Sequence, residues 1–310
     1  AVATADGVPF QTLQEALTAG GNVVLLQDIT ATDKLTAAAT ATLDLGGYNL
    51  TLANVEGNYA LIVKGDLTIA GNGTIVAPGG YGIGVSTTGK LTINGGNFFA
   101  TEINDYIIGN WGEVTINDGF FWGIYNVLNT FAEGSGTAVI TGGQFMTDET
   151  DYTGDYESET ILGINTTVTG GQFDKLASEY VADNYAYITT GEVVRLAEVI
   201  ADDIVTLESD VTMTEKLSVS GTTILDLNGH TLTLADLGYA YSLVVSGDLK
   251  IVGNGTIVAP GGFGIGVAAA GYLTIENGTF IAGTYNDYIV GNYGITVVNG
   301  GTFNGTYNCV

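Results

Sequence analysis

The sequence predicts an all-β fold: a right-handed parallel β-helix, or single-stranded β-solenoid, with about 23 residues and three short strands per coil and a short N-terminal capping helix. Three observations predict this fold. The chain of 310 residues contains 47 Gly and only 3 Pro, and short runs of alternating apolar and polar residues lie between the glycines. Apolar residues recur at a constant spacing along the chain, and a long segment of the sequence is repeated.

The long repeat covers residues 28–128, which align with residues 210–310 at a constant offset of about 182 and without a gap. The segment GNGTIVAPGG occurs at 71–80 and again at 253–262, and NDYIIGNWG at 104–112 corresponds to NDYIVGNYG at 286–294. Two copies of one structural unit are therefore expected.

A shorter period lies inside each copy. The last apolar residues of successive strand-like runs are about 23 residues apart, as in Leu52, Ile75, Phe98 and Phe121. Such spacing is typical of a solenoid, in which residues one coil apart lie above one another at a strand spacing of about 4.8 Å. One coil, at 59–79, consists of the three runs YALIV, GDLTIAG and GTIVAPG, with Gly at the corners. Alternation within LTI places Leu and Ile inside and Thr outside.

The elements follow in order along the chain. Residues 1–22 form a cap in which Thr12 and Glu15 make a capping box before a short helix that Gly20 and Gly21 end. Residues 23–173 form the first β-helix copy, with an acidic loop at 147–159. Residues 174–200 interrupt the repeat with a helix over Lys175–Val181 and two strands around Gly191. Residues 201–310 form the second copy, which stops in mid-repeat, so the expectation is either that the natural protein continues or that another chain caps this end.

Charge and hydropathy restrict the partners. The chain has 33 acidic and 7 basic residues and a formal net charge of −26, which opposes binding to nucleic acid or to an anionic lipid surface. Hydrophobic residues make up 45% of the chain and the mean hydropathy is +0.30, but no apolar run is long enough for a membrane span. The charge is interpreted as a soluble coat that prevents self-association of a strand-rich molecule.

The segments VPFQTLQEALTAGGNVVLLQDIT at 8–30, TLDLGGYNLTL at 42–52 and ILDLNGHTLTL at 224–234, with the recurring LTINGGNF and LTIENGTF, resemble pectate-lyase-like β-helix repeats. Such repeats are found in bacterial surface proteins and in fibre, spike and decoration proteins of bacteriophages. The resemblance covers nearly the whole chain. It implies the fold strongly and function weakly, because the same coil serves display, adhesion and polysaccharide cleavage.

The sequence favours a protein that is not an enzyme. Polygalacturonase-like glycosidases carry clustered Asp residues, a Gly-His-Gly and an Arg-x-Lys segment, whereas the single histidine here, His230, lies in NGHT and the single arginine, Arg195, in VVRLAE. Lyase chemistry needs converging basic side chains, and the lysines are scattered singly. A polysaccharide lyase or glycoside hydrolase fragment, with catalytic coils outside this sequence, remains the alternative. No cofactor is expected.

A Ca²⁺ site is a weaker hypothesis, because the acidic loop offers several carboxylates at 147–159 but no recognised ligand spacing. The weak candidate ligands are Asp148, Asp151 and Asp155. We expect a solvated surface loop and no metal.

Aromatic residues open the first strand of successive coils, with others nearby, and they could form a surface that binds sugar rings or a protein. The candidate ligand-binding residues are Tyr59, Tyr81, Tyr106, Trp111, Trp122, Tyr125, Tyr241, Phe263, Tyr288, Tyr293 and Tyr307. An aromatic ladder that stiffens a corner of the solenoid is the preferred interpretation, and outward-pointing rings would favour binding.

Together these observations predict a non-enzymatic extracellular structural or display protein, either a phage virion fibre or decoration protein or a bacterial surface or adhesin protein. A carbohydrate-binding module that uses the aromatic column is a further alternative. The expected partners are other structural proteins or further copies of the chain, with glycans as a second class. The expected location is a virion or a bacterial cell surface.

Overall fold

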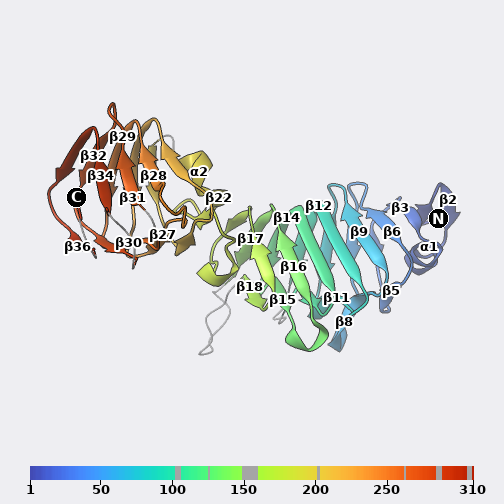
Figure 1. Cartoon of the computed structure of the whole chain (residues 1–310). Coiled ribbons are helices and arrows are strands. Elements are labelled where there is room, and N and C mark those ends of the chain that lie inside the picture. Colours follow the sequence, from blue (N-terminus) through green and yellow to red (C-terminus); the bar gives the residue numbers. More distant parts are fainter. Residues whose placement is uncertain are drawn as a thin grey trace. The chain divides into compact units, whose positions relative to one another are not determined.

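A computed structural model shows an all-β chain, with 54% strand and 6% helix, that forms a parallel β-solenoid of about 11 turns with about 24 residues per turn (Figure 1). The structure describes residues 1–101, 106–124, 126–148, 160–200, 203–261, 263–283, 288–305 and 309–310. The chain divides into two compact units, Ala1–Tyr180 and Val181–Val310. The turns are slightly longer than the expected 23 residues because some coils carry longer corners and loops.

Unit 1 contains three stacks of parallel strands, and each coil contributes one strand segment to each stack. The first stack contains β3 (Gly21–Leu25), β6 (Ala41–Asp44), β9 (Asp66–Ala70), the first halves of β12 (Lys90–Ala100) and β14 (Glu113–Gly123), β16 (Thr137–Ile140) and β19 (Thr166–Val168). The second contains β4 (Ile29–Thr30), β7 (Asn49–Thr51), β10 (Thr74–Ala77), the second halves of β12 and β14, β17 (Gln144–Thr147) and β20 (Gln172–Phe173). The third contains β5 (Leu35–Ala37), β8 (Val55–Val63), β11 (Gly80–Val85), β13 (Ile108–Asn110), β15 (Leu128–Thr130) and β18 (Ile161–Gly163).

Like side chains lie above one another inside unit 1. Phe98, Phe121, Phe145 and Phe173 form a buried ladder with ring centroids 4.7, 4.8 and 4.6 Å apart and ring planes within 9° of parallel. This ladder confirms the expected stacking of one coil on the next.

The 23-residue spacing predicts one strand pairing wrongly. Ile75 pairs with Leu50 and not with Leu52, because Leu50 and Leu52 both point inward and this coil is two residues longer than the period. In unit 2 the equivalent residue Ile257 likewise pairs with Leu232, the counterpart of Leu50.

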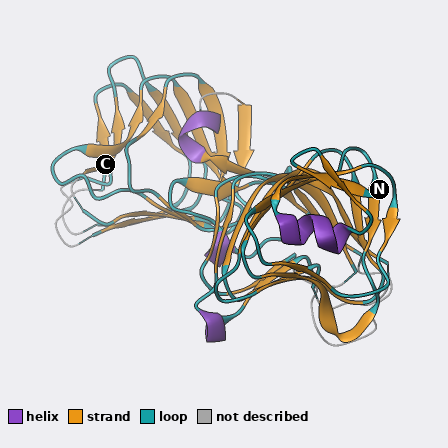
Figure 2. Ribbon diagram, turned by 90° about the vertical axis from the view of Figure 1, so that its right-hand side faces the viewer, coloured by secondary structure: helices purple, strands orange, loops and turns teal. Residues whose placement is uncertain are grey.

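A cap covers the first coil of unit 1. Strands β1 (Ala3–Ala5) and β2 (Val8–Phe10) form an antiparallel hairpin, and β1 pairs antiparallel with the edge of β3. Helix α1 (Leu13–Ala19) lies across the end of the coils (Figure 2) and buries Leu13, Ala16 and Leu17. The predicted capping box is present: the Glu15 N–H donates to Thr12 Oγ1 at 3.2 Å, and the Thr12 N–H donates to Glu15 Oε2 at 3.1 Å.

Unit 2 repeats the three stacks. The first contains β23 (Asp203–Thr206), β26 (Thr222–Asp226), β29 (Asp248–Val252), β32 (Tyr272–Ile275) and β35 (Ile295–Val298). The second contains β24 (Val211–Thr212), β27 (Thr231–Thr233), β30 (Thr256–Ala259), β33 (Thr279–Ala282) and β36 (Thr302–Asn304). The third contains β25 (Leu217–Val219), β28 (Tyr241–Val245), β31 (Phe263–Val267) and β34 (Val290–Asn292).

Unit 2 also begins with a cap. Strands β21 (Tyr185–Tyr187) and β22 (Val193–Arg195) form the antiparallel hairpin expected around Gly191, and α2 (Leu196–Val199) follows. The Glu208 N–H donates to the carbonyl of Tyr187 at 2.8 Å, so the hairpin is bonded beside the end of β23. The order hairpin, helix, first strand is therefore the same in both units.

The helix expected over Lys175–Val181 is not present as such. A single 3₁₀ turn, Ser178–Tyr180, lies there, since a segment of about seven residues is only marginally helical on its own. The Tyr180 hydroxyl instead donates to the carbonyl of Gly163 at 3.2 Å.

No helix of the described residues has the length and apolar character needed to cross a membrane.

Candidate functional site

Three members of the predicted aromatic set form a column on the outside of the third stack in unit 1. The ring centroids of Tyr59 and Tyr81 are 4.8 Å apart, and those of Tyr81 and Tyr106 are 6.0 Å apart. Trp111 meets Tyr59 edge-on at 5.5 Å and stacks on Phe131 at 4.3 Å. All five side chains are half-buried, largely against one another.

The column rests on glycines. The Tyr59 ring covers Gly84 and Gly109, where a Cβ would overlap the ring and its hydroxyl. Unit 2 repeats the arrangement with Tyr241 over Gly266 and Gly291.

The neighbours of Tyr241 are also repeated, with Phe263 at 5.0 Å and Tyr293 edge-on at 6.5 Å, while Tyr288 packs on Phe263 at 5.9 Å. Partial burial and a hydrogen bond with Tyr293 raise the pKa of Tyr241 to about 12. The rings point outward, and Tyr288 and Tyr293 are 38% and 73% exposed. Because the same set occurs at equivalent positions of both units, we nevertheless interpret it as part of the scaffold.

The other residues that were predicted as ligand-binding or metal-binding candidates do not belong to this column. Trp122 lies on β14 in the second stack, on a different face from Tyr59. Tyr125, Tyr307, Asp151 and Asp155 lie outside the described residues. Asp148 is described, and its N–H donates to the carbonyl of Gly123 at 2.9 Å, beside the end of β17.

A second group of aromatic residues lies on the outside of the second stack. Phe99, Phe120 and Trp122 project outward from β12 and β14, with centroids 5.7 Å apart for Phe99 and Phe120 and 6.4 Å apart for Phe120 and Trp122. Trp122 is 37% exposed, and Met146, its neighbour on β17, is 41% exposed. The inward residues Phe98 and Phe121 alternate with these outward residues along the same strands.

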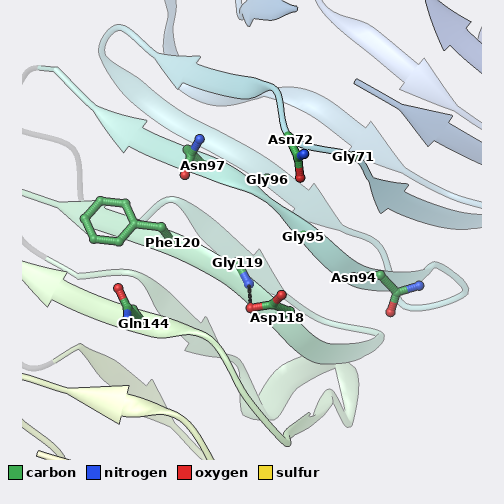
Figure 3. A pocket seen from close by; sticks show the side chains of 10 residues that line it. All are labelled: Gly71, Asn72, Asn94, Gly95, Gly96, Asn97, Asp118, Gly119, Phe120 and Gln144. Carbon is green, nitrogen blue, oxygen red and sulfur yellow. Dashed lines mark hydrogen bonds between the residues drawn. The ribbon is translucent and has the colours of Figure 1, made fainter. Parts of the chain in front are cut away.

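Polar side chains and glycines line a hollow of about 440 Å³ beside these rings (Figure 3). Its lining residues come from four successive coils, and they are Gly71, Asn72, Asn94, Gly95, Gly96, Asn97, Asp118, Gly119, Phe120 and Gln144. We call this hollow, together with Phe99 and Trp122, the aromatic–amide surface.

The hollow lies where β12 and β14 pass through a corner and their register is irregular between Ile93 and Asn97. Gly96 and Gly119 have φ values of 99° and 132°, which side chains rarely adopt, so the floor of the hollow carries no side chains there. The glycines thus expose backbone and amide groups at one bend. β-Bulges of this kind are frequent beside functional sites.

Asp118 gives the hollow a negative charge. Its Oδ1 accepts a hydrogen bond from the Gly119 N–H at 2.8 Å, and its side chain is exposed at the rim (Figure 3). Within the described residues that line the hollow, none is basic.

The second copy lacks this surface. At an offset of 182 residues, Asn97, Phe99 and Asp118 correspond to Thr279, Ile281 and Gly300. Phe120 and Trp122 correspond to Thr302 and Asn304, which pair in the same register. The second copy therefore forms the same strand pairing with Thr and Asn in place of Phe120 and Trp122.

The residues considered for catalysis lie apart from each other, and each contacts its own carboxylate. His230 occupies a turn after Gly229, and its Nδ1 is 3.5 Å from Asp210 Oδ1. Arg195 donates to both carboxylate oxygens of Glu215 at 2.7 Å, next to the cap of unit 2. Among the described residues, no three His, Cys, Asp or Glu side chains are grouped so as to hold a metal ion.

Comparison with known proteins gives no relative: no family model, no curated protein and no solved structure matches the chain.

Proposed function

We propose that this chain is a non-enzymatic display or adhesin protein that binds carbohydrate through the aromatic–amide surface of unit 1. In this proposal the protein acts outside the cell, on a bacterial surface or in a phage virion, as the resemblance to β-helix repeats of such proteins suggests. The regular coils serve as the rigid support of the binding surface.

One observation carries the proposal. Trp122 is 37% exposed and the half-buried Phe120 lies beside it, at outward positions where the equivalent coils of unit 2 have Asn304 and Thr302. Exposed aromatic rings increase the apolar surface in water and add nothing that this coil needs in order to fold. Their presence in one copy alone is therefore best explained by a ligand.

The chemistry of the neighbouring hollow fits a sugar. Aromatic faces pack against the C–H faces of pyranose rings, and amide side chains both donate to and accept from hydroxyl groups. Asn72, Asn97 and Gln144 supply amides beside Phe120 (Figure 3). Sites of this type, with apolar rings and a few placed polar groups, are typical of small-molecule binding.

A glycan array followed by titration calorimetry tests the proposal. The variants Trp122→Asn and Phe120→Thr introduce residues that the fold already accepts in unit 2, and each is expected to weaken binding by about tenfold, equivalent to about 1.4 kcal/mol. The matched control is Tyr239→Asn, which removes a tyrosine that is 90% exposed in unit 2 and should leave affinity unchanged.

The proposal is wrong if no glycan binds the intact chain. It is also wrong if Trp122→Asn binds every glycan as tightly as the natural sequence does.

A further inference from the structure

The electrostatic character of the aromatic–amide surface restricts its ligand further. Asp118 places a carboxylate at the rim of the hollow, and its Oδ1 is held by the Gly119 N–H at 2.8 Å. The described lining offers no Lys, Arg or His to balance a second negative charge. The nearest lysine along β12, Lys90, is already paired with Glu113 at 2.6 Å.

A like charge in this hollow is unfavourable for two reasons. An anionic group bound there would lie within a few ångströms of the Asp118 carboxylate, and the two like charges would repel each other. The chain as a whole has a formal charge of −26, which lowers the local concentration of anions at low salt. Sugar hydroxyls, in contrast, donate to a carboxylate without this penalty.

The length of the hollow indicates that it accommodates more than one sugar ring. Its lining comes from four successive coils, represented by Asn72, Asn97, Phe120 and Gln144. Three steps of about 4.8 Å across the strands give a length of roughly 14 Å. The outward rings of Phe99 and Trp122 lie beside this line on adjacent coils.

We infer that the aromatic–amide surface selects uncharged glycan chains of several sugar units and that Asp118 is the residue that excludes acidic ones. This inference rests on the proposed function, since it names the class of carbohydrate that the same surface binds.

The test compares pairs of polymers that share a sugar backbone, one of which carries added carboxylate groups. A glucan, a mannan and a galactan are each used in neutral and in carboxymethylated form, in affinity electrophoresis with the intact chain. For each backbone that binds, the neutral form is expected to bind about tenfold more tightly at low salt. The preference should weaken as salt is added.

Asp118→Asn and Asp118→Gly are the decisive variants. Asn keeps an oxygen acceptor for the Gly119 N–H, and Gly is the residue at the equivalent position 300 of unit 2, so both are expected to fold. Each should reduce the preference for the neutral form to about threefold or less and leave neutral binding within about threefold of the natural chain.

The outcomes separate the two proposals. If neutral and carboxymethylated forms bind equally, or if Asp118→Asn leaves the preference unchanged, the selection by Asp118 is wrong while carbohydrate binding stands. If none of the six polymers binds while the glycan array shows binding to another glycan, the inferred preference for neutral chains is wrong, and if the array is also negative both proposals are wrong. A response to single sugars as strong as the response to chains would contradict the inferred length of the site.

Discussion

At the scale of single residues, the outward tyrosines depend on glycines in neighbouring coils. Tyr59 lies over Gly84 and Gly109, which belong to the next two coils, so one side chain connects three coils. The equivalent contacts of Tyr241 with Gly266 and Gly291 show that the contact is a property of the coil. It adds an interaction on the outside of the solenoid to the ladders on the inside.

We expect Gly109→Ala to lower the free energy of unfolding of unit 1 by about 1–3 kcal/mol, because the new methyl group overlaps the Tyr59 ring. In a Tyr59→Ala background the same substitution should cost much less. Urea denaturation of the four chains in this double-mutant cycle measures the difference. Equal costs in both backgrounds would show that the ring and the glycine do not interact.

The sequence predicts which side chains point inward and which point outward wherever inward and outward residues alternate along a strand. The apolar period placed Phe98 and Phe121 inside, and this is confirmed. The same alternation places Phe99, Phe120 and Trp122 outside, so the signal for the aromatic–amide surface was present in the sequence. The comparison of outward positions between the two copies would have revealed it. The amides of the hollow were not predictable, because they meet only where the corners of four coils coincide.

At the scale of elements, each unit protects the exposed edge of its first strand. β1 pairs antiparallel with β3 in unit 1, and the β21–β22 hairpin is bonded beside β23 in unit 2. An antiparallel strand ends the parallel stack. It occupies the edge to which a further coil would have to add a parallel strand. Open parallel edges invite association with other chains.

Removal of residues 1–20 is therefore expected to expose β3 and to cause concentration-dependent association. Sedimentation velocity over a range of protein concentrations measures this. As a control, Thr12→Ala, which removes one bond of the capping box, should cost only about 1 kcal/mol and keep the edge covered. A truncated chain that remains monomeric at all concentrations would contradict the protective role.

The caps were predictable only in part. The helix α1 follows from its capping box, which uses side chains close in sequence. The hairpin before it was missed, although Asp6 and Gly7 have φ values of 48° and 80° and form the tight turn that an Asp-Gly pair favours. Helix α2 has four residues and no side-chain cap, so no local signal announces it.

At the scale of the whole molecule, two separate cores account for the division into units. In unit 2 the buried cluster runs from Ala186 in the cap to Val290 in β34 and includes Leu249 and Phe280. Unit 1 has its own Phe ladder from Phe98 to Phe173. A core that is contiguous within one unit makes that unit a cooperative folding element.

Two unfolding transitions are accordingly expected in differential scanning calorimetry. Phe145→Ala should cost about 3–5 kcal/mol and shift only the transition of unit 1, while Leu249→Ala should cost about 2–5 kcal/mol and shift only that of unit 2. A single transition that both substitutions shift by similar amounts would mean that the units unfold together.

Because hairpin, helix and first strand recur in the same order before each set of coils, a block of about 182 residues contains everything that a foldable module needs. Recombination between the duplicated gene segments, by adding or deleting one whole block, would leave every remaining module with its own covered start. Such a change in copy number leaves outward positions to diverge independently in each module, as the contrast between Trp122 and Asn304 illustrates.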